Sequence, residues 1–89
     1  MKRVALLTMA VFIAVFSLAQ DAAEKINQAN EALKAQEFAK AYSLYDEALQ
    51  NLGDVQVDES IYYNVGYSAY KSDNMEGALN YFDKAIEVG

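Results

Sequence analysis

The side chains that could carry chemistry in this chain are hydroxyls and carboxylates, because its 89 residues include no cysteine and no histidine. That composition excludes thiol nucleophiles, imidazole acid–base catalysis and histidine metal sites. The acidic pairs Asp46-Glu47 and Asp58-Glu59 lack the alternating oxygen ligands and the turn glycine of a calcium loop. We therefore expect no enzymatic activity, no cofactor and no metal site.

Three tyrosines form the pattern that most strongly suggests a function. Tyr63, Tyr67 and Tyr70 are spaced by four and then three residues, which places them on one face of a helix. Tyrosine combines a large contact area with a hydrogen-bonding tip, and this suits a binding surface. An alternative is that Tyr63 or Tyr70 simply covers a neighbouring pair of helices. Tyr67 is the one that we expect to be most exposed.

The N-terminal segment has the pattern of a secretory signal peptide. Residues 1–3 carry positive charge, residues 4–18 carry none, and the segment ends in small residues at Ala19. Cleavage there would assign 1–19 to a signal peptide and predict export, with the periplasm as the destination. An uncleaved membrane anchor is the alternative, although a spanning helix needs about 20 apolar residues.

The remaining residues, 20–89, are strongly acidic. They contain five lysines and thirteen acidic residues, a net charge of −8, whereas the whole chain has −6. Such a surface repels phosphate backbones and anionic lipids. We therefore expect no nucleic-acid partner, and contact with a membrane only through an uncleaved signal sequence.

Four helices and no strand are expected after the signal segment. Apolar residues recur at spacings of three and four, and the absence of proline leaves the helix interiors unbroken. Gly53 is predicted to end the second helix in a left-handed conformation. Because the connections are short, consecutive helices should be antiparallel and form two hairpins in an all-α fold. The expected helices cover about 21–35, 38–52, 57 or 58 to 71, and 75–88.

One residue pattern occurs twice, offset by 37 residues, and predicts that both hairpins are built alike. Each copy has a small residue, then alanine twelve positions later, an aromatic residue four further on and a second alanine after three more. Small residues at facing positions allow the two helices of a hairpin to pack closely, and the aromatic residue fills the space beside them. The copies are Ala29, Ala41, Tyr45 and Ala48, and Gly66, Ala78, Phe82 and Ala85.

The stretches 62–66, 70–71 and 75–87 resemble a tetratricopeptide repeat (TPR), a two-helix unit with a 34-residue period. The resemblance implies a TPR-like domain over 20–89, with repeat one at about 22–53 and repeat two at about 58–89. The first copy departs further from the family, since it has Ala29 where glycine is usual and Lys25 where a large apolar residue is usual. Gln36 stands in the first hairpin turn and Asp73 in the second, so the first turn is expected to be looser.

In that family the first helix of each unit lines a groove that binds partners. The resemblance therefore implies a groove formed by Tyr63, Tyr67, Tyr70 and Lys71 together with Ile26, Asn30, Leu33 and Lys34. Some members hold a peptide carboxylate between asparagines and lysines. Asn30 and Asn64 occupy such positions, but Ile26 replaces the lysine, so we do not expect this clamp.

These expectations predict a non-enzymatic module that binds a peptide or helix of a partner protein. One alternative is self-association, as a homodimer through the fourth helix, with Leu79, Ile86 and Val88 buried. Another is that the chain is the N-terminal scaffold segment of a larger envelope protein, whose activity resides beyond residue 89. Repeat arrays generally need at least three units, which motivates both alternatives.

Overall fold

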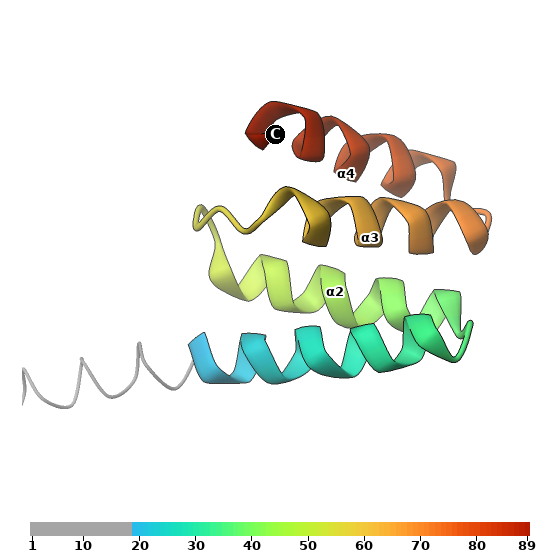
Figure 1. Cartoon of the computed structure of the whole chain (residues 1–89), viewed down its shortest axis with the longest axis horizontal. Helices are drawn as coiled ribbons and strands as arrows, with labels where there is room; N and C mark the ends of the chain where they lie inside the picture. The colour runs from blue at the N-terminus through green and yellow to red at the C-terminus, as the bar shows by residue number, and fades with distance from the viewer. Residues whose placement is uncertain (1–18) are drawn as a thin grey trace, which may run out of the picture.

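The computed structural model describes residues 19–89, so the predicted signal segment lies outside the described residues apart from Ala19. Residues 19–89 contain four helices and no strand, in agreement with the predicted all-α fold. The first helix includes residues 19–34, and it is followed by α2 (Phe38–Leu52), α3 (Glu59–Lys71) and α4 (Met75–Val88). Figure 1 shows the four helices side by side in chain order, each antiparallel to the one before, so that they form two hairpins.

The bounds of α2 and α4 agree with those predicted. Side-chain caps mark the starts of α3 and α4. Asp58 precedes α3 and its carboxylate accepts a hydrogen bond from the Ser60 N–H at 3.0 Å. Asn74 caps α4 in the same way, because its side-chain oxygen accepts from the Gly77 N–H at 3.0 Å. Both contacts satisfy backbone donors that a helix start leaves open. Glu37, which precedes α2, makes no such contact.

The turns inside the two hairpins have the same backbone geometry. Gln36 and Asp73, 37 residues apart, have φ angles of 61° and 64°. Each is followed by an N–H that reaches back to the preceding helix, from Glu37 to the Ala32 carbonyl and from Asn74 to the Ala69 carbonyl, both at 2.8 Å. This bond closes a helix end around a left-handed residue. The expectation of a looser first turn is therefore wrong, because backbone hydrogen bonding holds Gln36 in the conformation that Asp73 adopts.

Gly53 ends α2 with a φ of 64° and a ψ of −121°. The positive φ was expected, but the ψ differs from the left-handed helical value of about +47°. No atom would obstruct a side chain here, so the requirement for glycine comes from the backbone conformation alone.

Burial of the repeated pattern depends on where each helix lies. In the first copy Ala29, Ala41, Tyr45 and Ala48 are all fully enclosed. In the second copy Gly66 and Ala78 are buried, whereas Phe82 and Ala85 are only partly so. The reason is that α2 lies between the first helix and α3, while α4 lies at the edge of the layer (Figure 1).

Gly66 lies against an aromatic ring. A Cβ atom added to it would come within 2.6 Å of the Phe82 ring. Close approach at Gly66 was expected, although the sequence pattern indicated Ala78 as the facing residue. The ring of Phe82 therefore uses the space that the glycine leaves.

Polar contacts fasten α2 to other helices beyond the hairpin turns, and two of them reach α4 and the first helix. The Tyr81 hydroxyl donates to an Asp46 carboxylate oxygen at 2.5 Å and so joins α4 to α2. Lys25 of the first helix forms an ion pair with Glu47 of α2 at 2.5 Å. Within 19–89, no buried side-chain nitrogen or oxygen lacks a hydrogen-bond partner.

Candidate protein-binding surface

The three tyrosines of the predicted ridge lie on the outer face of α3. The exposed fractions are 55% for Tyr63, 36% for Tyr67 and 53% for Tyr70. The opposite side of the helix contributes Tyr62, Val65 and other residues to the core. The spacing of four and three residues thus separates a buried face from an aromatic outer face, as it does on any amphipathic helix.

Contacts between aromatic rings fix the arrangement of this surface. They also explain why the expectation for Tyr67 was wrong. The rings of Tyr63 and Tyr67 are nearly parallel, with 6.5 Å between their centroids and 14° between their planes. The Tyr67 ring also meets the Phe38 ring edge-on, at a centroid distance of 5.9 Å and an angle of 81°. Tyr67 is therefore the least exposed of the three, whereas we expected it to be the most exposed.

Phe38 is the residue of this surface that the sequence analysis did not assign to it. It is the first residue of α2, and it lies beside the end of α3 because the two helices are antiparallel. Lys71 places its ammonium nitrogen 5.7 Å from the centre of the Phe38 ring, a distance at which a cation and a ring attract. The antiparallel order of the helices was the signal that could have located Phe38 here. We call the set Tyr63, Tyr67, Tyr70, Phe38 and Lys71 the aromatic platform.

The groove residues predicted from the first helix have different surroundings. Ile26 and Leu33 are half-buried and pack against the core. Lys34 is largely exposed and lies 3.8 Å from Glu31 on its own helix. No ring contact or ion pair among the described residues joins these side chains to the aromatic platform.

The environment of the buried Tyr45 hydroxyl includes the side chains of Asn30 and Asn64. This hydroxyl donates a hydrogen bond to the Asn30 side-chain oxygen. Burial raises the pKa of Tyr45, and a hydrogen bond with the Asn64 side chain opposes that rise. The contact with Asn30 joins the first helix to α2.

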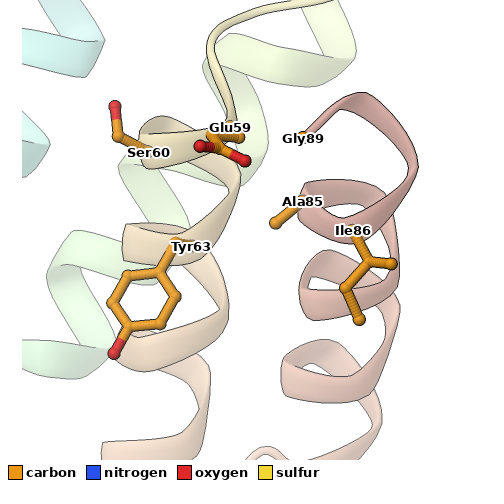
Figure 2. Close-up of a pocket in the computed structure, with 6 residues that line it drawn as sticks. All are labelled: Glu59, Ser60, Tyr63, Ala85, Ile86 and Gly89. Carbon is orange, nitrogen blue, oxygen red and sulfur yellow. The ribbon is translucent and has the colours of Figure 1, made fainter.

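An open cleft of about 570 Å³ continues from the platform towards the C-terminus. Figure 2 shows that its wall comes from the first turns of α3 and the last turns of α4. Tyr63 belongs to both the cleft and the platform, and its ring centroid lies 5.7 Å from that of Phe82. The lining residues are Glu59, Ser60, Tyr63, Ala85, Ile86 and Gly89.

Metal-binding clusters and membrane-spanning helices are both absent from the part of the chain that the structure describes. Residues 19–89 contain no group of three or more acidic side chains close enough together to hold a metal ion. Over the same residues, every helix is too short or too polar to span a bilayer.

No protein-family model, no curated protein and no solved structure matches this chain.

Proposed function

We propose that this chain is a non-enzymatic protein-interaction module, exported to the periplasm, that binds a peptide or helical segment of a partner protein on the aromatic platform. The observation that carries the proposal is the row of exposed tyrosines on α3, whose middle member, Tyr67, packs against Phe38. Large aromatic side chains in a fixed arrangement bind with little loss of conformational entropy.

The order within the platform supports this role. Tyr67 contacts rings on both sides, so its side chain is already positioned before a partner arrives. Tyr63 and Tyr70 each leave about half of their surface exposed, including area for a partner's apolar groups. A platform that is ordered in advance avoids much of the cost of ordering side chains on binding.

The proposed relationship to tetratricopeptide repeats comes from the sequence resemblance, and the two hairpins are compatible with two such units. Their turns have equal geometry at a spacing of 37 residues, and the small residues of the repeated pattern lie in helix contacts. A binding surface made by the first helix of each unit would place α3 at the centre of the groove.

Selection from a library of random peptides displayed on phage would test the proposal. Peptides enriched on the purified chain should bind the Tyr70→Ala variant roughly tenfold more weakly, as expected for loss of an aromatic anchor. Tyr70 suits this test because no ring contact in the described structure depends on it. Circular dichroism should show the same helical content for the variant and the original chain.

Val55→Ala provides the matched control. Val55 is 60% exposed and lies in the connection before α3, so its loss removes apolar surface away from the platform. Enriched peptides should bind this variant as well as they bind the original chain. The proposal fails if the library yields no enriched sequence, or if enriched peptides bind the Tyr70→Ala variant with undiminished affinity.

A further inference from the structure

The outer face of α4 carries a second surface, made of aliphatic side chains. Met75, Leu79 and Ile86 are 55%, 60% and 77% exposed, the last being the largest exposed fraction among the large hydrophobic residues of 19–89. Their spacings of four and seven residues put them on one line along the helix. Exposed apolar residues in a contiguous row usually mark an interaction site. We call these three residues the α4 stripe.

The α4 stripe continues into the cleft shown in Figure 2. Ile86 belongs to both, and across the cleft lies Tyr63 of α3. A side chain inserted between these two would contact apolar atoms on both sides. The cleft therefore offers a pocket at one end of an otherwise linear surface, the arrangement by which a groove holds an amphipathic helix.

Acidic residues border this surface on both sides. Glu76, Asp83 and Glu87 are exposed on α4 and follow one another at spacings of seven and four, in a line beside the α4 stripe. Glu59 lies at the wall of the cleft on α3. None of these four carboxylates belongs to an ion pair within the described residues.

The basic residue of α4 does not offset these charges. Lys84 lies with its ammonium 4.9 Å from the centre of the Tyr81 ring, and Tyr81 is buried on the inner side of the helix. The local field around the α4 stripe is therefore negative, in keeping with the net charge of −8 over residues 20–89.

From these observations we infer that α4 docks a cationic amphipathic helix of a partner protein. Its apolar face would cover the α4 stripe and fill the cleft, while lysine or arginine side chains along its edges would meet Glu76, Asp83, Glu87 and Glu59. Since α4 has 14 residues and a helix rises about 1.5 Å per residue, a partner helix of roughly the same length would cover the whole stripe.

Charge selects this occupant over a second copy of the chain. Two α4 helices packed together would bring two rows of carboxylates into proximity, with each Lys84 placed beside its own Tyr81 ring. Like charges facing each other across an interface oppose association. The inference does not rest on the proposed function, because the α4 stripe contains no residue of the aromatic platform, although the cleft and the platform share Tyr63.

A designed peptide provides the probe. It has about 15 residues, with leucines at helical spacing on one face and lysines along the borders of that face. Two companion peptides serve for comparison, one with glutamate in place of every lysine and one with the basic sequence scrambled. Binding of each labelled peptide to the purified chain is measured by fluorescence anisotropy at low and at physiological salt.

The basic amphipathic peptide is expected to bind one chain saturably, more weakly as salt rises, and roughly tenfold more weakly to the Ile86→Ser variant. Ile86→Ser leaves the charge of the protein unchanged, so it separates apolar docking from general attraction. Tyr70→Ala, on the aromatic platform, should leave this binding unaltered. Circular dichroism should show the same helical content for the Ile86→Ser variant and the original chain.

A pair of charge variants tests the acidic border. Neutralising Glu76→Gln, Asp83→Asn and Glu87→Gln together should weaken binding by roughly tenfold or more. Neutralising Asp21→Asn, Glu24→Gln and Asp54→Asn changes the net charge equally but leaves the border intact, and should change the affinity by much less. Equal losses in the two triple variants would overturn the inference.

Three other results would also overturn it. Equal binding of the acidic or the scrambled peptide would show that neither the charges nor the helical arrangement is recognised. Undiminished binding to Ile86→Ser would remove the α4 stripe from the site. A dimer detected by sedimentation and dissociated by Ile86→Ser would show that a second copy covers this surface instead.

Discussion

Gly66 shows how a single missing side chain determines a contact between two helices. In the middle of a helix, glycine costs about 1 kcal/mol relative to alanine. Glycine occurs here despite this cost because a Cβ atom on residue 66 would lie only 2.6 Å from the Phe82 ring. The identity of residue 66 therefore depends on packing against α4 rather than on helix propensity.

The Gly66→Ala variant is expected to be less stable by about 1–2 kcal/mol. Overpacking a tight contact typically costs about 1–3 kcal/mol, more than the gain in helix propensity of about 1 kcal/mol when the ring has little room to move. Urea unfolding followed by circular dichroism measures the difference. Combining Gly66→Ala with Phe82→Leu should cost less than the sum of the single changes, because leucine vacates part of the space. A Gly66→Ala variant as stable as the original chain would contradict this account.

The site predictions relied on spacing within single helices, and they missed contacts that come from other helices. Tyr67 was expected to be exposed because the sequence spacing assigns it to the outer face, and that assignment is correct. Spacing within one helix carries no information on Phe38, which is 29 positions earlier and contacts Tyr67 only because α2 and α3 are antiparallel neighbours. The role of Asn30 and Asn64 likewise depends on Tyr45, which approaches them from a third helix.

Local sequence signals were most informative at the starts of helices and least informative at the first hairpin turn. Asp58 and Asn74 precede α3 and α4 and cap them, and both are residue types that commonly precede helices. The first hairpin turn is different. Gln36 has no special preference for positive φ, and the hydrogen bond from the Glu37 N–H to Ala32 holds it there. Residue preference alone could not predict that turn, because the packing of the two helices determines it.

The Gln36→Gly variant should therefore be more stable than the original chain. A left-handed conformation costs a residue with a side chain about 1–2 kcal/mol, and the greater freedom of glycine in the unfolded chain offsets about half of that relief. We expect a gain of about 0.5–1 kcal/mol, measured by thermal and urea unfolding. For a domain of this size that corresponds to an increase in Tm of a few degrees, about 4–8 °C per kcal/mol.

Two glycine variants provide controls for that gain. Asp73→Gly should gain less, since aspartate tolerates the left-handed region better than glutamine does. Glu37→Gly should lose stability, because Glu37 has a φ of −88° and gains nothing from the freedom of glycine. If Gln36→Gly and Glu37→Gly shifted stability in the same direction, strain at Gln36 would not be the cause.

On the scale of the whole molecule, the layer of helices is fastened by contacts that skip one helix. Adjacent helices pack against each other, so α4 would otherwise be held by α3 alone. Tyr81 provides a further link, because its ring meets that of Tyr42 at a centroid distance of 6.2 Å and its hydroxyl donates to Asp46, both on α2. These contacts join the two hairpins directly, in addition to the packing of α3 against its neighbours.

That link makes the stability of the whole chain depend on alkaline pH. Burial raises the pKa of Tyr81 above its usual value of about 10, and the hydrogen bond to Asp46 and the charge of Asp46 raise the pKa further. The phenol binds its proton more tightly in the folded than in the unfolded chain. Its contribution to stability is therefore complete below a pH of about 10 and is lost progressively as the pH rises above that value. The free energy of unfolding in urea, measured from about pH 8 to pH 11.5, should fall across the upper part of this range.

The Tyr81→Phe variant separates this residue from the other groups that titrate at high pH. It should be less stable at pH 8, because Asp46 loses its buried partner, but its stability should fall less steeply above pH 10. Asp46→Asn removes the carboxylate that helps to hold the proton and should also make the fall shallower. Asp83→Asn, an exposed carboxylate change on the outer part of α4, should retain the original slope. Equal slopes for Tyr81→Phe and the original chain would mean that the contact between α4 and α2 does not control alkaline unfolding.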